Sequence, residues 1–259
     1  MITINAGQST SFPRIADAIE AAKAYAPMPV TIHIAPGRYH EKLTVSQPHV
    51  TLMGDDASNT ILTYDDYARE IMPDGIKRGT FRTYTLFLDA PDITLCNLTV
   101  ENAAGAGKEV GQAIALYAEG EGIRVKNCRL IGSQDTLFTG PLPEKEKEPG
   151  GFRGPKEFAP RINGRQYYKN TYICGGVDFI FGSATAYFEH CTLESLLRTK
   201  ASAQSDLVST TSTLHDSGSD TSALCHSNSD MVQKNYTLPP IQCYVTAAST
   251  PEGQEYGYI

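Results

Sequence analysis

The sequence predicts an all-β solenoid, of the kind called a parallel β-helix, with a short helix at its N-terminal end. Three observations support this fold class. An eight-residue segment recurs four times, each copy alternates apolar and polar residues around a polar fifth position, and an amphipathic helical segment precedes all four copies. Repeats of one strand-forming unit at irregular intervals are typical of solenoids, in which each coil contacts only its neighbours.

The recurring segments are ITLCNLTV at 93–100, IRVKNCRL at 123–130, QYYKNTYI at 166–173 and AYFEHCTL at 186–193. Their fifth positions are Asn97, Asn127, Asn170 and His190. Period-two alternation indicates a strand, and its change of phase at the polar residue indicates a bend, where Asn tolerates a left-handed conformation. Each segment is therefore predicted to form two short strands joined by a corner.

The corners are separated by 30, 43 and 20 residues (127 − 97, 170 − 127 and 190 − 170). The coils would thus share the same cross-section but differ in the length of the surface loops inserted between their strands. Val50, Leu52 and Gly54 indicate an earlier coil. An antiparallel sandwich is the alternative, but it needs Asn-Gly hairpin turns between neighbouring strands, and these are scarce here.

The segment FPRIADAIEAAKAYAP at 12–27 is predicted to form the N-terminal helix. Ile15, Ala18, Ile19 and Ala22 share one helical face, Pro13 stands before them and Pro27 after them. A helix here would cover the open end of the solenoid, whose strands otherwise expose an edge.

Two long excursions interrupt the repeats. Residues 141–160 are rich in proline, glycine and charge and are predicted to form a surface loop. Residues 198–229 hold 14 Ser or Thr among 32, which predicts a disordered insert without a ladder strand. We expect residues 1–259 to form a single β-helix domain with an insert at about 198–243.

Composition excludes several classes of partner. The formal net charge is −7 and the basic residues form no cluster, so nucleic acid is not expected as a ligand. No apolar stretch approaches the length of a membrane span, and the first residues lack a leader, so we expect a cytoplasmic protein unless a leader was removed. The six cysteines show no CxxC pair and no tight spacing with His, so no metal site or cofactor is predicted.

Two aspartates occupy equivalent places in the repeats. Asp135 lies eight residues after Asn127 and Asp178 eight after Asn170, which predicts carboxylates on adjacent strands about 4.7–4.9 Å apart. Turn aspartates are common, but like charges at this distance cost stability, whereas such a pair suits an acid and a nucleophile. The sequence therefore favours a catalytic pair over a solvated acidic ridge.

Two glutamines stand beside this pair. Gln134 adjoins Asp135, and Gln112 precedes an apolar run one coil earlier. A side-chain amide can donate to an oxyanion that develops during acyl transfer, although an exposed amide on a strand is an equally good interpretation of each glutamine alone.

At these residues the chain resembles the pectin methylesterases, a family of right-handed parallel β-helix enzymes. GQAIALY, SQDTLFTG and GGVDFIFGSATAYFEHC are similar to successive family signatures, as are IADAIEAA, IHIAPGRYHEKLTV, GTFRTYTLFL and YVTAASTPEGQEYGYI. The resemblance covers residues 1–197 and resumes at 244.

The resemblance implies roles for six residues. Asp178 would be the nucleophile, Asp135 the general acid and then base, and Gln112 and Gln134 the oxyanion donors. Gln112 would also contact substrate, together with Thr85 and Phe81, although simple packing is the alternative for Phe81. The implied reaction is hydrolysis of methyl esters of pectin to pectate and methanol, without a metal, by a protein expected to be a monomer.

The chain departs from the family pattern in two respects, of which the first is the insert at about 198–243. The family carries an Arg-Pro-Trp motif downstream, and this chain contains no Trp and ends at Ile259. On that basis we expect an incomplete family domain with weak or no esterase activity. A β-helix glycosidase or lyase acting on pectin, and an inactive pectin-binding β-helix, are the alternative functions.

Overall fold

The chain forms three β-sheets that wind around one core in the computed structural model, which describes residues 2–196, 209–213 and 244–248. The first sheet contains β1 (Ile2–Ala6), β2 (Val30–Ile34), β5 (Val50–Gly54), β8 (Thr94–Cys96), β11 (Ile123–Lys126), β14 (Arg165–Lys169) and β17 (Thr185–Glu189). The second contains β4 (Leu43–Val45), β7 (Leu86–Leu88), β10 (Leu116–Ala118), β13 (Leu137–Thr139), β16 (Val177–Gly182) and β20 (Tyr244–Ala248). The third contains β3 (Gly37–His40), β6 (Thr60–Tyr64), β9 (Thr99–Asn102), β12 (Arg129–Ile131), β15 (Tyr172–Gly175), β18 (Thr192–Leu196) and β19 (Ser209–Thr213).

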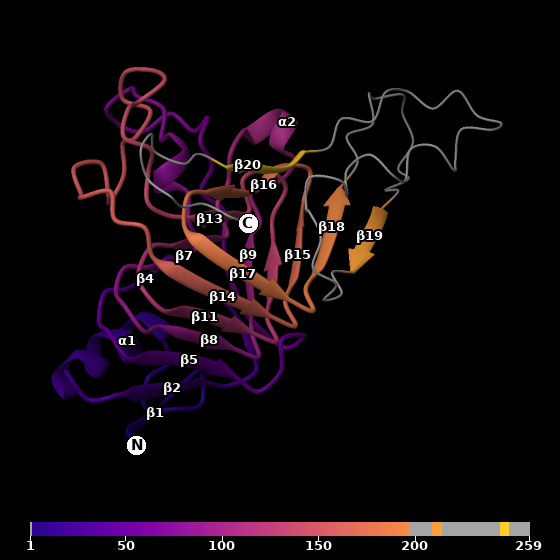
Figure 1. The fold of residues 1–259 in the computed structure, drawn as a ribbon. Helices are drawn as coiled ribbons and strands as arrows, with labels where there is room; N and C mark the ends of the chain where they lie inside the picture. The colour runs from indigo at the N-terminus through magenta and orange to yellow at the C-terminus, as the bar shows by residue number, and fades with distance from the viewer. Residues whose placement is uncertain (1, 197–208, 214–243, 249–259) are drawn as a thin grey trace.

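Strand order follows chain order in every sheet, as Figure 1 shows for the first sheet. All pairings except that of β18 with β19 are parallel, and the chain visits the sheets in turn. This arrangement is a right-handed parallel β-helix, so the predicted fold class is confirmed. Each of the four recurring segments forms two strands joined by a corner, and β5 is the earlier coil.

The corner residues adopt the conformation that the sequence predicts. Asn97, Asn127, Asn170 and His190 have φ between 49° and 55°. Asn127 donates through Nδ2 to Asn97 Oδ1 at 3.2 Å, and Asn170 Nδ2 donates to Asn127 Oδ1 at 3.1 Å. The corners therefore stack, each satisfying the amide of the next, because equivalent residues of neighbouring coils lie one strand spacing apart.

The residues flanking the corners fill the core. Leu95, Val125 and Tyr168 are fully buried before the corner, and the ring of Tyr168 stacks on that of Phe188 with centroids 4.6 Å apart. After the corner the buried column consists of Leu98, Cys128, Thr171 and Cys191. Successive coils thus place side chains of similar size on one another, and burial of this apolar column is the main stabilising contribution.

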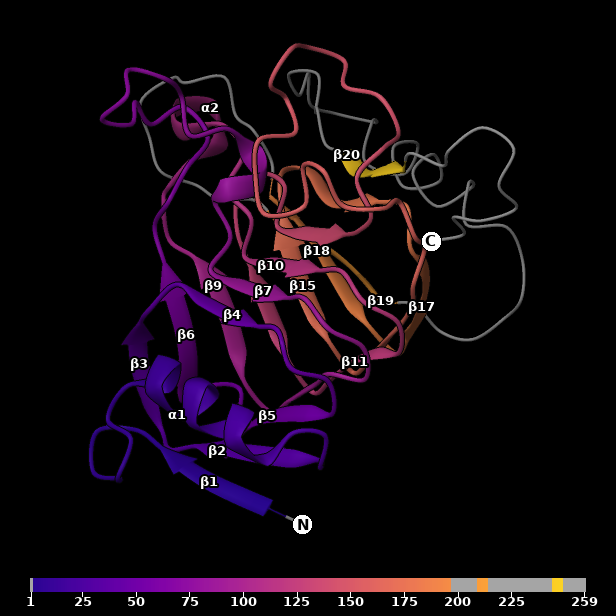
Figure 2. The same cartoon turned by 90° about the vertical axis from the view of Figure 1, so that its left-hand side faces the viewer.

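Helix α1 (Ile15–Ala22) covers the N-terminal coils, where it packs on β1, β2 and β4 (Figure 2). Its buried residues are Ile15, Ala18, Ile19 and Ala22, as predicted. Arg14 offers no side-chain cap, and instead Glu41 accepts hydrogen bonds from the backbone N–H groups of Ile15 and Ala16 at 2.9 and 3.0 Å. A carboxylate at a helix N-terminus satisfies unpaired donors and complements the helix dipole.

Two predictions on the excursions have different outcomes. Residues 141–160 form turns without a helix or strand, as predicted for a loop, although Phe152 is buried. The expectation that 198–229 contains no strand is wrong at Ser209–Thr213, because β19 pairs antiparallel with β18. Because β19 runs antiparallel to β18, it extends the third sheet at its edge and is not a further coil of the β-helix. The remaining residues of 198–243 lie outside the described residues.

The other helical segments are short: η1 (Lys23–Tyr25), η2 (Thr80–Arg82) and α2 (Gly107–Val110). Among the described residues, no helix has the length and apolar character needed to cross a bilayer. The segment η2 lies directly before β7 and contributes to the site described next.

Candidate active site

Asp135 and Asp178 occupy the same register position on neighbouring strands of the second sheet. Leu137 of β13 pairs with Ile180 of β16, and each aspartate lies two residues before its paired residue. The register extends upstream through a bridge between Gln134 and Val177, and the N–H of Asp135 donates to the carbonyl of Val177 at 3.1 Å. The shared register predicted from the sequence is therefore confirmed, with backbones about 4.8 Å apart.

Both aspartates have left-handed backbones, with φ of 61° at Asp135 and 45° at Asp178. Asp tolerates this backbone region better than most residues. The two aspartates lie on adjacent coils, so they form a second row of left-handed corners beside the row of asparagines. Asp135 is 7% exposed, and Asp178 is half-buried. Unusual backbone conformations that the fold maintains at equivalent positions are typical of functional sites.

The turns that carry the two aspartates are bonded to each other. Thr136 donates through Oγ1 to the carbonyl of Cys174 at 2.8 Å, and the N–H of Gly176 donates to the carbonyl of Ser133 at 2.6 Å. A Cβ at Gly175 would lie 2.3 Å from Cβ of Phe179 and 2.7 Å from Oγ1 of Thr136. This close approach explains the glycine before the VDFIFG motif and fixes the separation of the two turns.

The two glutamines lie close to the aspartates along the chain of neighbouring coils, and Gln112 has a register of its own. Leu116 pairs with Leu137, so the residue that shares the aspartate position is Ile114, and Gln112 lies two residues upstream. Ala113 donates to the carbonyl of Gln134 at 3.0 Å, which places Gln112 and Gln134 on adjacent coils. The structure thus gathers both glutamines and both aspartates at the N-terminal edge of β10, β13 and β16.

Thr85 is not brought to the surface. It is fully buried, and its hydroxyl donates to the carbonyl of Glu101 at 2.7 Å. This hydrogen bond joins the residue before β7 to β9 inside the fold. The observed contacts of Thr85 are therefore structural.

Phe81 lies in an aromatic cluster beside the aspartates. Its ring centroid is 5.0 Å from that of Phe138, 6.0 Å from Phe152 and 6.3 Å from both Tyr117 and Phe181. Phe138 and Phe181 each follow an aspartate by three residues. Phe81 is 8% exposed. Together with Phe138 and Phe181 it forms an apolar wall next to the acidic pair.

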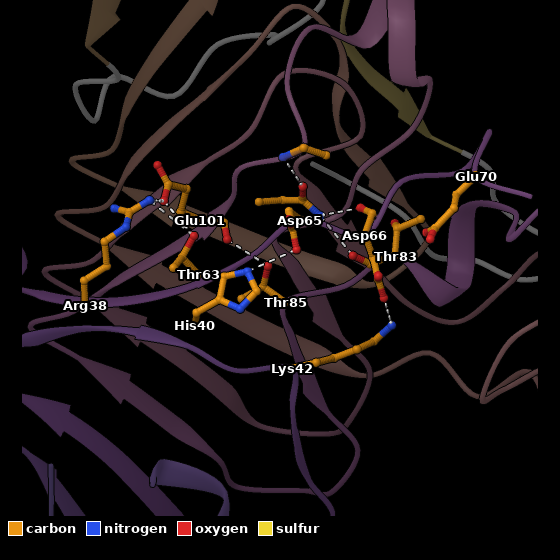
Figure 3. Close-up of polar contacts among 12 residues, drawn as sticks. Arg38, His40, Lys42, Thr63, Asp65, Asp66, Glu70, Thr83, Thr85 and Glu101 are labelled. Carbon is orange, nitrogen blue, oxygen red and sulfur yellow. Dashed lines mark hydrogen bonds and ion pairs between the residues drawn. The ribbon is translucent and has the colours of Figure 1, made fainter. Parts of the chain in front are cut away.

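A partly buried polar network on the same flank was not predicted; Figure 3 shows its members Lys42, Asp66 and Glu70. Arg78 pairs with Asp66 at 2.8 Å and with Glu70 at 2.6 Å, and Lys42 also bonds Asp66. Burial lowers the pKa of Lys42, an effect that the hydrogen bond and charge of Asp66 oppose. Lys42 is 24 residues from Asp66, and no local motif connects the two. The only signal is the position of Lys42 directly before the apolar run of β4.

The amide of Asn102 ties this network to the strands. Its Nδ2 lies within hydrogen-bond distance of the carbonyls of Asp66 and Thr83, at 3.0 and 2.9 Å. Within residues 2–196, no group of His, Cys, Asp and Glu side chains has the arrangement needed to hold a metal ion. The chemistry that the described side chains offer is that of carboxylates, amides and an apolar wall.

The chain is thus a parallel β-helix protein with two aspartates and two glutamines near the N-terminal ends of neighbouring strands. Comparison with known families makes the assignment more specific: the chain belongs to the pectinesterase family, whose model matches residues 1–142 and 161–245. The unmatched residues are 143–160, within the 141–160 loop, and 246–259. The matched range includes the segment predicted to be an insert.

Curated relatives support this family membership. Pectinesterase QRT1 of Arabidopsis thaliana is 33% identical over 64% of this chain and 40% of its own length. Pectinesterase 31 of Arabidopsis thaliana is 29% identical over 74% of this chain and 55% of its own length. The chain thus spans about half or less of the length of these relatives.

Solved structures show the same fold. A pectin methylesterase in complex with a hexasaccharide aligns with a TM-score of 0.63 at 28% identity, covering 78% of this chain and 58% of that one. The pectin methylesterase PemA of Erwinia chrysanthemi aligns with a TM-score of 0.61 at 28% identity and the same coverage.

Proposed function

We propose that the chain is a carboxylic ester hydrolase that removes methyl esters from pectin and releases methanol. The observation that carries this proposal is the shared register of Asp135 and Asp178 on β13 and β16. Family membership supports the substrate class, as does the hexasaccharide held by a related pectin methylesterase.

In the proposed mechanism, the carboxylate of Asp178 attacks the ester carbonyl carbon of a methylated uronate unit. Gln112 and Gln134 donate to the oxyanion of the tetrahedral intermediate. As the C–O bond to the methoxy group breaks, protonated Asp135 gives its proton to the departing oxygen, and methanol leaves. An acyl-enzyme anhydride between Asp178 and the sugar remains.

Water completes the cycle. Asp135, now ionised, takes a proton from a water molecule that adds to the sugar carbonyl of the anhydride. The bond to Asp178 breaks, its carboxylate is restored, and the uronic acid product is released. Asp135 is protonated again, so both aspartates return to their starting states. The apolar wall of Phe81, Phe138 and Phe181 would exclude bulk water beside the reacting ester.

The direct test is a set of product assays on highly esterified pectin. We expect methanol release that is abolished in Asp178→Asn, with no new reducing or unsaturated ends. Asp17→Asn, an exposed aspartate on α1, is the matched control and should release methanol at the parental rate.

Two other outcomes would replace this proposal. The backbone spacing of the aspartates also suits a retaining glycosidase, whose carboxyl groups lie about 5–5.5 Å apart, and reducing ends formed without methanol would identify that reaction. Unsaturated ends would identify a lyase. Pectin binding that is equal in the parent and in Asp178→Asn, without any turnover, would identify a binding protein.

A further inference from the structure

The outer face of the second sheet carries a row of aromatic rings, which we call the aromatic row. Its members pair in one register on β7, β10, β13 and β16 and are Phe87, Tyr117, Phe138 and Phe181. The first three are at most 1% exposed. Leu142 and Phe152 of the 141–160 loop belong to the same buried cluster, so the loop covers this part of the sheet.

Two charged side chains hold the 141–160 loop together. Glu146 accepts hydrogen bonds from the N–H groups of Gly150 and Phe152 at 2.9 and 3.0 Å. Arg161 donates to four backbone carbonyls at 2.6 to 3.1 Å, those of Pro143, Lys156, Glu157 and Ala159. Charged groups form strong hydrogen bonds, so the loop is a compact body that packs on the sheet as a unit.

Lys156 attaches this compact loop to the sheet. Its ammonium pairs with the carboxylate of Asp89, directly after β7, and lies 5.9 Å from the ring centroid of Phe87. The two side chains are 21% and 29% exposed, so solvent screens their attraction less than that of a fully exposed pair. Among the residues that the structure describes, no other ion pair joins the 141–160 loop to the β-helix.

Asp89 has a second carboxylate beside it. Leu88 pairs with Ala118, so Asp89 and Glu119, the next residues on each coil, lie about 4.8 Å apart in the backbone. Burial raises the pKa of Glu119, and the charge of Lys156 opposes that rise. Because like charges at this distance repel, the sheet offers a position at which a cation from the loop is stabilising.

The loop reaches the acidic pair through Phe81. A Cβ at Gly154, two residues before Lys156, would lie 2.8 Å from Cβ of Phe81. The ring centroid of Phe81 is 6.0 Å from that of Phe152 and 5.0 Å from that of Phe138, three residues after Asp135. The placement of the loop therefore determines the placement of the apolar wall beside the aspartates.

We propose that Lys156 and Asp89 are positioning residues for the esterase reaction, an inference that rests on the proposed function. Their ion pair, to which Glu119 adds a second carboxylate, fixes the 141–160 loop on the aromatic row and keeps Phe152 and Phe81 in place. The family model does not match residues 143–160, so this attachment is a feature of this chain and not of the family pattern.

Loss of the ion pair should affect binding more than chemistry. The turns that carry Asp135 and Asp178 are joined by main-chain hydrogen bonds in which the loop takes no part. A loosely attached loop must be ordered each time the polymer binds, which raises KM. We expect Lys156→Gln to raise KM for highly esterified pectin by about threefold or more and to change kcat by less than about twofold.

Fluorescence measures the placement of the loop without turnover. The chain contains no Trp, so Phe152→Trp introduces a single reporter into the buried aromatic cluster. In this background, Lys156→Gln should raise the acrylamide quenching constant by about threefold or more, because the ring becomes accessible when the loop detaches. Lys156→Arg retains the charge and should restore both the parental quenching and the parental KM.

The two carboxylates lead to a graded response. Asp89→Asn leaves Glu119 facing Lys156, so it should increase quenching less than Lys156→Gln does. Asp89→Asn combined with Glu119→Gln removes both anions and should match Lys156→Gln. Lys145→Gln makes the same charge change at an exposed position of the same loop and is the matched control, with quenching and KM expected to stay parental.

A second measurement keeps the test independent of the tryptophan. Thermal unfolding checks that each variant retains the fold. If Phe152→Trp does not fold, chymotryptic cleavage after Phe152 in the chain without Trp gives the same comparison, since a docked loop protects that peptide bond. Lys156→Gln should then be cleaved faster than the parent and Lys145→Gln at the parental rate.

Three results would overturn the positioning role: quenching and cleavage that are unchanged in Lys156→Gln, a detached loop with unchanged KM, or a lower KM. The last would show that the loop obstructs the site. A parent chain that releases no methanol would remove the proposed function instead. Quenching and cleavage would still decide whether Lys156 fixes the loop on the sheet.

Discussion

The backbone N–H of Asp135 donates to the carbonyl oxygen of Val177 at 3.1 Å, one residue before Asp178. The bond therefore joins the turn that carries Asp135 to the turn that carries Asp178. The acidic pair is thus built into the ladder by main-chain contacts. The main-chain bonds that join the two turns do not depend on the carboxylate groups.

Asparagine substitutions should separate catalysis from folding at these positions. Asn tolerates the left-handed backbone, so Asp135→Asn and Asp178→Asn should keep the melting temperature of the parent within about 2 °C, as expected for changes of less than about 0.5 kcal/mol. Each should lower methanol release by at least 1000-fold, an estimate of about 4 kcal/mol in transition-state stabilisation. Asp135→Ala, which has the left-handed penalty, should lose about 1 kcal/mol of stability. Equal stability of the Ala and Asn variants would contradict this account.

The asparagine corner should be sensitive to both its hydrogen bonds and its backbone. Asn127→Ala loses the bonds to Asn97 and Asn170 and places Ala at φ 53°, which together should cost about 2 kcal/mol in the free energy of unfolding. Asn127→Gly removes the same bonds without the backbone penalty, so urea denaturation should show a smaller loss. A Gly variant as unstable as the Ala variant would show that the left-handed backbone contributes nothing.

Phe81 should behave as a packing residue. Phe81→Ala opens a cavity among Phe138, Phe152 and Tyr117 and should lower the free energy of unfolding by about 3–4 kcal/mol. Phe158 is 93% exposed, so Phe158→Ala is the control and should be neutral. A neutral Phe81→Ala with weakened pectin binding would instead support the substrate contact implied by the family resemblance.

Glu119 should give a pH-dependent contribution to stability. Burial raises the pKa of Glu119 above its usual 4.5, although Lys156 and the hydroxyl of Tyr117 oppose the shift. A carboxyl with a raised pKa binds its proton more tightly in the folded state, so its stabilising contribution is complete below about pH 4.5 and is lost as pH rises through the folded pKa. Glu119→Gln should therefore gain stability relative to the parent between pH 4 and pH 8 in urea titrations.

An oppositely shifted carboxyl is the control for this experiment. Hydrogen bonds from Arg165 lower the pKa of Glu121. Its contribution is present above about pH 4.5 and is lost as pH falls through the folded pKa, so Glu121→Gln should lose stability relative to the parent at pH 8 and not at pH 3. The same pH trend in both variants would show that the effect comes from net charge and not from the environment of Glu119.

Local patterns predicted the coils because each coil repeats the same physical constraints. Alternation gave the strands, and the polar fifth position gave the left-handed corners at Asn97, Asn127 and Asn170. The common offset from these corners placed Asp135 and Asp178 in one register without any structural information. Helix α1 was equally local, since its buried face is a simple helical period.

Features that depend on long excursions were not predictable. The burial of Thr85 depends on a carbonyl acceptor from Glu101 on another strand, and the Lys42–Asp66–Arg78 network joins three separate segments. The register of Gln112, two residues upstream of the position equivalent to the aspartates, depends on where β10 begins, and the apolar run that follows Gln112 does not show this. Nothing in the Ser/Thr-rich composition of 198–229 indicated the antiparallel strand β19.

Because Asp135 and Asp178 come from different coils, the acidic pair belongs to an interface inside one chain, in the way that some active sites belong to an interface between subunits. Separation of β16 from β13 would dismantle the pair while the earlier coils stayed folded, since solenoids can open locally. Loss of turnover on heating would then precede the loss of most secondary structure. Under the proposed function, turnover would therefore report on the docking of two neighbouring coils.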